Sequence, residues 1–378
     1  MGFEIDYLPV GQKADDKSGD AIAMRFWDTE PNDAFVITID GGTLDSGGAL
    51  VEHIKNYYGT NTIDLAILTH PDADHASGIR EVLEQMDVKQ LWAFMPWEHA
   101  EEILPIVQSA DARVTAESIE QRLKDAFPAA VEAIELAQKK DVAVMEPFAD
   151  ESIIEITDKT RAFPLSPTQE AYLTKWLPNY DCLPKQSSVD MSMFEKLLKG
   201  TQRVVQGSIK WIVESWDKEL LLDPGANDVN AANNSSVILA IQQGLDYFLF
   251  CGDAGVPALE DALSKAEDYE LPTDGFTFFH IPHHGSRHNL GPSILNKMFG
   301  KSQAAPDNNA KVFGYVSATK DDPKHPSRRI TNALNRRGVK SVGTCGRNIV
   351  YRSQDAPNRE GWSGTTTIPF YNEVEDVE

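Results

Sequence analysis

The sequence lacks any apolar run long enough to cross a membrane: no stretch of about 18 apolar residues occurs in its 378 residues. Its first twelve residues have neither the basic nor the apolar region of a secretory signal. Its three cysteines are widely spaced and form no Cys-x-x-Cys pair, which argues against a disulfide-stapled protein and against a thiolate zinc site. We therefore expect a cytoplasmic protein without membrane association.

Basic residues are also scarce: the chain has 35 Lys and Arg against 58 Asp and Glu, which gives a net charge of −23. So acidic a chain should repel nucleic acid and anionic membranes at long range. Residues 324–352 are the exception, because this segment contains eight basic residues and no acid, so the rest of the chain sums to −31. Either the segment is a docking surface for a negatively charged substrate, or it is a solvated helix face.

Apolar residues make up 41% of the chain, enough for a large buried core. Strand-like segments alternate with helix-like ones, which indicates an α/β protein. The predicted strands are 35–40, 63–69, 203–214, 219–223, 236–241, 247–251, 276–281, 311–317 and a pair within 341–352. The predicted helices are 79–86, 98–108, 116–140, 257–267 and 327–337, and 164–184 is predicted as a loop.

The strongest chemical signal is His70-Pro-Asp72-Ala-Asp74-His75, between a predicted strand end and a predicted helix. It places two imidazoles and two carboxylates on one tight loop. Such ligands together suit zinc, manganese or iron. Turn and capping preferences would explain one or two of these residues, but not four at alternating spacing.

Three other strand ends carry polar residues. Asp253 follows an apolar strand and a glycine, His283 and His284 follow another strand, and Asp40 precedes two glycines. In open α/β sheets, ligands bind at the carboxyl ends of the strands. Taken alone, Asp253 would be interpreted as a helix N-cap, and the Asp40 turn is a weak signal. The adjacent imidazoles of His283 and His284 favour a ligand.

In this order, these segments resemble the metallo-β-lactamase superfamily, whose metal loop is usually His-x-His-x-Asp-His, followed by a strand-end Asp and a late strand-end His. Asp72 stands where most members have the second His, and this variant is similar to the soluble domain of the DNA-uptake channel protein ComEC. The resemblance covers about 1–95 and 205–352. Further local matches are Leu8-Pro-Val-Gly-Gln12, Asp40-Gly-Gly42, Asn233-Asn-Ser-Ser-Val-Ile-Leu239, His283-His-Gly-Ser286 and His325-Pro326.

The resemblance implies an αββα sandwich. Residues 1–95 would form its first half, 205–378 its second half, and 96–204 a mainly helical insertion or cap. Many members have a middle His ligand, but the only His between the metal loop and Asp253 is His99. Because His99 lies in a predicted helix of the insertion, we interpret it as a surface or core residue.

The resemblance also implies two divalent metal ions, zinc or manganese, with single-metal occupancy as an alternative. Asp253 would bridge the two ions. The other expected metal ligands are His70 and Asp72 on one ion, and Asp74, His75 and one of His283 and His284 on the other.

Three residues are catalytic candidates on the same basis. Asp74 would orient the nucleophile, and His288 or His325 would protonate the leaving group. The implied activity is that of a metal-dependent hydrolase that uses a metal-bound hydroxide. We expect a phosphodiesterase or nuclease acting on DNA, RNA or a small phosphodiester.

The charge distribution narrows the expected substrate to an anionic one near residues 324–352, such as a short single strand or a nucleotide. The net charge of −31 on the rest of the chain disfavours a long binding surface for duplex nucleic acid. Two alternatives stay open: a hydrolase of lactones or thioesters on the same fold, and a non-catalytic metal-binding interaction module. The sequence indicates no particular protein partner.

Overall fold

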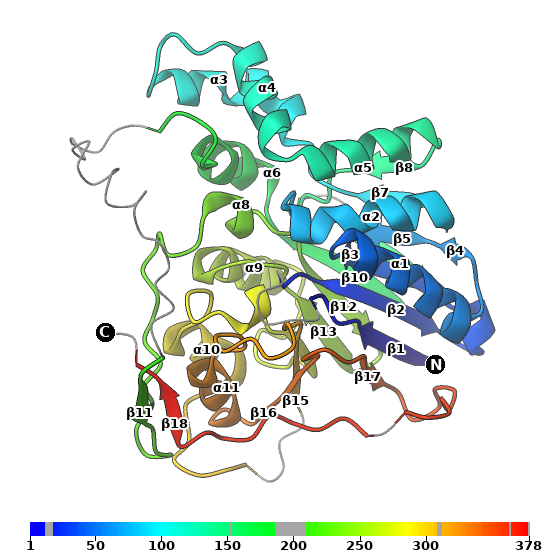
Figure 1. The fold of residues 1–378 in the computed structure, drawn as a ribbon, viewed down its shortest axis with the longest axis vertical. Helices are drawn as coiled ribbons and strands as arrows, with labels where there is room; N and C mark the ends of the chain where they lie inside the picture. Colours follow the sequence, from blue (N-terminus) through cyan, green and yellow to red (C-terminus); the bar gives the residue numbers. More distant parts are fainter. Residues whose placement is uncertain (12–17, 151–152, 186–208, 308–311, 363, 377–378) are drawn as a thin grey trace.

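The computed structural model describes residues 1–11, 18–150, 153–185, 209–307, 312–362 and 364–376. Within these residues, two seven-stranded sheets pack face to face, and helices cover the outer side of each sheet (Figure 1). The expected αββα sandwich is therefore confirmed.

The first sheet carries α1 (Leu44–His53), α2 (Ala73–Gln85) and α5 (Pro128–Lys139) on its outer side. Strands β3 and β5 are parallel, whereas β2 runs antiparallel to β3. The strand order is β17 (Ile349–Arg352), β1 (Gly2–Tyr7), β2 (Ala21–Trp27), β3 (Phe35–Gly41), β5 (Leu65–Ile67), β7 (Gln90–Trp92) and β8 (Ala143–Met145).

The second sheet carries α9 (Val256–Asp268), α10 (Pro292–Phe299) and α11 (Arg328–Asn335) on its outer side. Its four neighbouring strands β13, β14, β15 and β16 are parallel, and β16 lies at the edge of the sheet. The strand order is β16 (Val339–Gly343), β15 (Val312–Val316), β14 (Phe278–His280), β13 (Asp246–Phe250), β12 (Ile238–Gln243), β10 (Thr160–Ser166) and β9 (Ile154–Thr157).

The remaining elements are short or peripheral. Two small strand pairs are β4 (Thr62–Ile63) with β6 (Asp87–Val88) and β11 (Trp211–Val213) with β18 (Glu373–Glu375). The other helices and helical turns are α3 (Ala100–Gln108), α4 (Ala116–Ala126), α6 (Gln169–Ala171), α8 (Ala231–Asn234), η1 (Pro31–Asp33), η2 (Ile54–Tyr58), η3 (Pro96–His99), η4 (Tyr172–Trp176), η5 (Leu177–Asn179) and η6 (His283–Gly285). The described helices include none with the length and apolar character needed to span a bilayer.

Aromatic side chains fill the space between the two sheets. The rings of Phe3 on β1 and Phe248 on β13 lie 4.8 Å apart, centroid to centroid. Along β13, Phe248 and Phe250 face the first sheet, whereas Leu249 and Cys251 pack toward the helices on the other side. Side chains alternate across a strand, so a strand buried on both faces has a continuous apolar sequence.

The segment 96–204 contributes more than a helical cap. In its described part, β8 lies at one edge of the first sheet, and β9 and β10 form an edge of the second. Helices α3 and α4 project beyond the sandwich at the top of Figure 1, while α5 packs on α2. The boundaries at 96 and 204 stay predictions, and residues 186–204 lie outside the described residues.

Several predicted elements have different bounds. Helix α2 begins at Ala73 instead of Ile79, since Asp74 in its first turn complements the helix dipole. The predicted helix 116–140 is two helices, because Pro128 lacks an N–H and starts α5.

The loop predicted over 164–184 is wrong, since it contains the end of β10 and the turns 169–179. The strand predicted over 219–223 is also wrong, because Arg329 takes the Leu220 carbonyl that a partner strand would use. Of the strand predicted over 203–214, residues 203–208 lie outside the described residues, and β11 forms part of the rest.

Three arginines of the basic segment 324–352 hold the fold together. Arg336 is 1% exposed, and its Nη2 lies 2.8 Å from Glu214 Oε1. Arg337 Nη1 lies 2.7 Å from Glu219 Oε1, and the buried Arg329 donates to two backbone carbonyls. These side chains are not free to contact a substrate. Contact through the other basic residues of the segment stays a prediction.

The sequence left two positions open for His99, at the surface or in the core. In the structure it lies in the core of the segment 96–204. Its imidazole is 7% exposed and lies between Glu102 Oε1, at 2.7 Å from Nδ1, and Glu146 Oε2, at 2.8 Å from Nε2. Burial disfavours the charged ring, but the two carboxylates outweigh it and raise the pKa of His99 to about 9. The ring is an internal cation here, with both nitrogens occupied.

We predict that the free energy of unfolding decreases as the pH rises from about 6.5 to about 9. Charged His99 stabilises the fold fully below its unfolded pKa of about 6.5, and this contribution is lost as the pH rises through the folded value, on the order of 3 kcal/mol in total. Urea unfolding of wild type and His99→Gln at pH 6, 7.5 and 9 measures it. An equally steep decline in the variant would contradict the prediction.

Candidate metal centre

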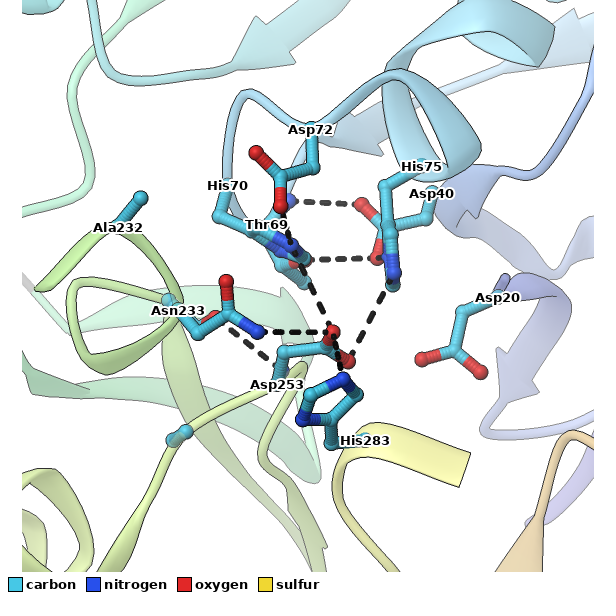
Figure 2. A network of polar contacts seen from close by, with 12 residues as sticks. Asp20, Asp40, Thr69, His70, Asp72, His75, Ala232, Asn233, Asp253 and His283 are labelled. Carbon is cyan, nitrogen blue, oxygen red and sulfur yellow. Dashed lines mark hydrogen bonds and ion pairs between the residues drawn. The ribbon is translucent and has the colours of Figure 1, made fainter. Parts of the chain in front are cut away.

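The polar residues gather where strand ends of the two sheets meet (Figure 2). Asp40 ends β3 and His70 follows β5, which is parallel to β3. Asp253 follows β13, and His283 follows the parallel strand β14. Parallel strands in a sheet end at the same edge, so these segments converge although up to 243 positions separate Asp40 from His283 in the sequence.

The carboxylate of Asp253 lies at the centre of the cluster. Its Oδ2 is 3.8 Å from His70 Nε2 and 3.6 Å from His283 Nε2, and its Oδ1 is 3.7 Å from His75 Nε2. Asn233 Nδ2 donates to Oδ2 at 3.3 Å. Asp253 is 4% exposed, and its Oδ1 has no hydrogen-bond partner.

Asp40 and Thr69 fix the orientation of the two imidazoles from the metal loop. His75 Nδ1 donates to Asp40 Oδ2 at 2.7 Å. His70 Nδ1 donates to Thr69 Oγ1 at 3.0 Å, because that hydroxyl gives its own proton to Asp40 Oδ2. Both Nε2 atoms are buried, lack a hydrogen-bond partner and point toward Asp253. A second partner at Nδ1 is the usual arrangement behind a metal-binding histidine.

The two consecutive histidines are held in the same way. His283 Nδ1 donates to Asn289 Oδ1 at 3.0 Å, and His284 Nδ1 donates to the Ser317 carbonyl at 3.2 Å. Both residues adopt left-handed backbone conformations, with φ of 49° and 57°. Such strain in residues other than glycine collects at functional sites. In all four histidines Nδ1 is occupied, which leaves each Nε2 available to a metal.

Close backbone contacts bring Asp40 to His75. A Cβ on Gly41 would lie 2.3 Å from the backbone of Gly78, so β3 and α2 approach each other only because both positions are glycine. Asp40 itself has a φ of +54°. Its carboxylate also accepts the N–H of Thr69 at 2.8 Å, so both of its oxygens are hydrogen-bonded.

The charges in the cluster act strongly on one another. Burial raises the pKa of Asp253, but His283, His75 and His70 outweigh it and hold that pKa far below its usual range. Burial lowers the pKa of His75, but Asp253 and Asp40 outweigh it and raise that pKa well above 6.5. A cation at His75 Nε2 would therefore replace a proton, which makes metal affinity depend on pH. Burial lowers the pKa of His284 to about 4, so its ring is neutral at pH 7.

The residues fit divalent metal ions. Among the described residues, two groups have ligand atoms within 4.8 Å of one another, namely His70, His75 and Asp253, and Asp20, Asp40 and His75. The Nε2 atoms of His70 and His75, Oδ1 of Asp253 and both oxygens of Asp20 are buried and lack hydrogen-bond partners, whereas the oxygens of Asp40 are hydrogen-bonded. Mixed imidazole and carboxylate ligands suit zinc and manganese, but do not choose between them.

Six of the seven predicted metal ligands lie together. Asp72 Oδ2 lies 3.7 Å from His70 Nε2, and the rings of His75 and His284 lie 5.9 Å apart. The half-exposed side chains of Asp72 and His283 border the cluster toward solvent. The residues brought together are His70, Asp72, His75, Asp253, His283 and His284.

For the other three predicted residues, the described part of the chain gives no ion pair with the carboxylates or imidazoles of this cluster. Asp74, a predicted ligand and catalytic residue, is half-buried in the first turn of α2 and belongs to neither group of converging ligand atoms among the described residues. The two predicted acids have other partners: His288 Nδ1 lies 3.5 Å from Asp228 Oδ2, and His325 Nδ1 lies 3.0 Å from Asp322 Oδ2. The roles of all three residues stay predictions.

Sequence reasoning missed four polar residues of the site. Asn233 had appeared only as part of a matching segment, and Asn289 and His280 carried no signal. Asp20 could have been found from strand register, because Ala21 pairs with Gly41 across the antiparallel strands β2 and β3. The residue before β2 therefore lies beside the turn that follows β3.

Two cavities flank the turn that carries the consecutive histidines. One, of about 790 Å³, is lined by His283 and Asn233, both of which contact Asp253, and by Trp176 from the segment 96–204. The other, of about 650 Å³, is lined by Ser286 and His288 on this turn's C-terminal side, and by Arg287, Lys324 and His325.

No family model matches the chain, and no curated protein matches it. Similar solved structures include the metallo-beta-lactamase fold protein YhfI from Bacillus subtilis (7% identity, TM-score 0.40, 93% of this chain and 100% of that chain). They also include unliganded yeast PDE1 (11%, 0.41, 90% and 97%) and Zn²⁺-bound PqqB from Methylobacterium extorquens (8%, 0.39, 92% and 99%). The relation to the ComEC-type domain stays a prediction, and the functional assignment rests on the side chains described above.

We predict that Asp40→Asn lowers the affinity for zinc or manganese about 10- to 100-fold, because the amide no longer holds the proton of His75 Nδ1 as a carboxylate does. Competition with a chromogenic chelator measures the affinity. Asp64→Asn is the matched control, since Asp64 accepts the N–H of Val36 at the other end of β3. Equal affinities of the Asp40 variant and wild type would contradict the role given to Asp40.

Proposed function

We propose that this chain is a metal-dependent hydrolase of short phosphodiesters, such as a nucleotide or a short single-stranded nucleic acid. One observation carries the hydrolase proposal. The Nε2 atoms of His70, His75 and His283 lie within 3.6–3.8 Å of the two oxygens of Asp253, and each ring is held through Nδ1 by another group. The resemblance of the sequence to the metallo-β-lactamase superfamily, and to the ComEC-type domain in particular, supports the same proposal.

Divalent ions held by these residues would lower the pKa of a bound water molecule and polarise the phosphoryl oxygen of a substrate. Asp253 faces all three imidazoles and would take part in binding both ions. Asn233 holds one oxygen of Asp253 in place through its amide. Substrate would reach the cluster past Asp72 and His283, whose side chains are 35% and 36% exposed.

The two cavities suggest how a short substrate binds. Because they flank the turn His283–Ser286, a phosphodiester that crosses the turn would place one arm in each cavity. Arg287 and Lys324 are exposed at the second cavity and would attract the anion. The two predicted acids, His288 and His325, both line this cavity, and either would be placed to protonate a leaving group there.

Three arginines of the basic segment bind other groups of the protein, and this supports a small substrate. Arg329, Arg336 and Arg337 pair within the fold, so the basic segment offers only part of its charge to a ligand. The overall charge of −23 opposes a long electrostatic contact with nucleic acid.

We predict that His75→Ala and Asp253→Asn each lower kcat/KM for bis-p-nitrophenyl phosphate roughly 1,000-fold, or about 4 kcal/mol in the barrier, because each removes a central metal-binding group. Purified protein reconstituted with zinc or manganese is assayed against phosphodiester, lactone and thioester substrates. Circular dichroism checks that the variants are folded.

The substrate panel separates the alternatives. Turnover of lactones or thioesters with no phosphodiester cleavage would replace the proposed substrate class with an acyl substrate. Retained metal without turnover of any substrate would indicate a binding module. Wild-type rates in both variants would contradict the assignment of the site.

We predict that Arg287→Glu and Lys324→Glu raise KM for a short oligonucleotide about tenfold and reduce the dependence of KM on salt, because each reverses a charge beside the substrate. Steady-state kinetics at 50 and 200 mM salt measures both effects. Arg113→Glu is the control: Arg113 is 90% exposed and pairs with Asp111. An equal effect of all three variants would show that KM depends on the net charge of the protein and not on the charge at positions 287 and 324.

A further inference from the structure

Asp20 is a buried carboxylate without hydrogen bonds. The residue is 0% exposed, and neither of its oxygens has a hydrogen-bond partner. Burying an ionised carboxylate without such partners costs several kcal/mol. It also lies beside the metal cluster, since a ligand atom of Asp20 falls within 4.8 Å of ligand atoms of Asp40 and His75 (Figure 2). The two other members of this group differ from Asp20, because Asp40 is fully hydrogen-bonded and His75 is held through Nδ1.

The backbone around Asp20 is built for a close approach to the site. A Cβ on Gly19 would lie 2.1 Å from the carbonyl oxygen of Asp74, so only glycine allows this segment to touch the first turn of α2. Ala21 pairs with Gly41 across β2 and β3. Together these contacts hold Asp20 against the end of β3 and the start of α2, next to His75.

His280 is a further neighbour of Asp20. The N–H of Cys251 donates to His280 Nδ1 at 3.4 Å, so the neutral ring carries its proton on Nε2. That Nε2 lies 3.3 Å from Asp20 Oδ2. This tautomer is the opposite of the other four histidines at the site, which donate from Nδ1. This approach is an ion-pair distance and not a hydrogen bond, since neither His280 Nε2 nor the oxygens of Asp20 have a hydrogen-bond partner.

A second buried Asp–His pair shows what a purely structural carboxylate looks like in this chain. Asp6 lies 3.4 Å from His53 Nε2 and is equally buried, but it also accepts the hydroxyl of Tyr58 at 2.7 Å and pairs with Arg359. Both oxygens of Asp6 are satisfied in this way. Among the described residues, Asp20 has neither a hydroxyl nor a guanidinium partner and is compensated only by imidazoles, so a metal ion would compensate its charge more fully.

We propose that Asp20 is a ligand of the second metal ion, which it shares with His75, His284 and the unpartnered Oδ1 of Asp253. The inference rests on the proposed function and assigns to Asp20 the place that the sequence pattern assigns to Asp74. It explains why the oxygens of Asp20 lack hydrogen bonds and why Gly19 packs against α2.

The test is a count of metal ions per chain. Wild type, Asp20→Asn, Asp74→Asn and the matched control Asp6→Asn are loaded with manganese, desalted and analysed by inductively coupled plasma mass spectrometry. We expect two ions in wild type, in Asp74→Asn and in Asp6→Asn, and one in Asp20→Asn. Electron paramagnetic resonance should show coupled manganese ions in wild type and isolated ions in Asp20→Asn.

Two ions in Asp20→Asn, or loss of an ion from Asp74→Asn instead, would overturn the inference, as would a wild-type count of one. These outcomes leave the proposed function intact if wild type hydrolyses phosphodiesters. A wild type that binds no metal would instead defeat the proposed function.

Thermal unfolding in the presence of a chelator tests the inference even if a variant is unstable. If Asp20 serves the metal, Asp20→Asn removes a buried charge that has no hydrogen bond in the metal-free protein. The metal-free variant should then melt at or above the wild-type temperature and gain less on adding manganese. If Asp20 is a structural ion pair with His280, the metal-free variant should melt lower, as Asp6→Asn should. That second result would overturn the inference.

Discussion

The site depends on a concentration of negative charge that the protein does not neutralise with lysine or arginine. Asp20, Asp40 and Asp253 are each at most 4% exposed and surround His75. Among the described residues, these carboxylates form ion pairs with histidines alone. Imidazoles compensate buried carboxylates by taking up protons, but a divalent cation compensates them better and lets the imidazoles act as ligands.

This constraint explains the local backbone. Carboxylates that repel one another approach only if the chain around them is held firmly, and here small residues and strained turns hold it. Gly41 and Gly78 let β3 touch α2, and the left-handed conformations of His283 and His284 turn both rings toward the cluster. The free energy spent on this strain is offset by the two large cores on either side of the second sheet.

The sequence was sufficient where chemistry and local pattern coincide. The His70–His75 loop, Asp253 after an apolar strand and the consecutive histidines could each be recognised from neighbouring residues, and together they predicted the sandwich. Asp20 could not be recognised in this way, because its place follows from pairing between β2 and β3 and from a glycine contact with α2. The motif position of Asp74 predicts a ligand, and that role stays a prediction, since among the described residues its side chain belongs to neither group of converging ligand atoms.

The basic segment shows that sign of charge alone does not identify a binding surface. Arg336 is entirely buried and bonds to Glu214 and to carbonyls of the same region, so its charge stabilises the attachment of that region to α11. Arginine suits this use, because its planar group donates several hydrogen bonds in fixed directions. In a chain with a net charge of −23, an arginine has many internal acids to pair with. Exposed cations at the cavities beside the histidine turn, such as Arg287 and Lys324, are therefore more informative about the substrate than a run of basic residues in the sequence.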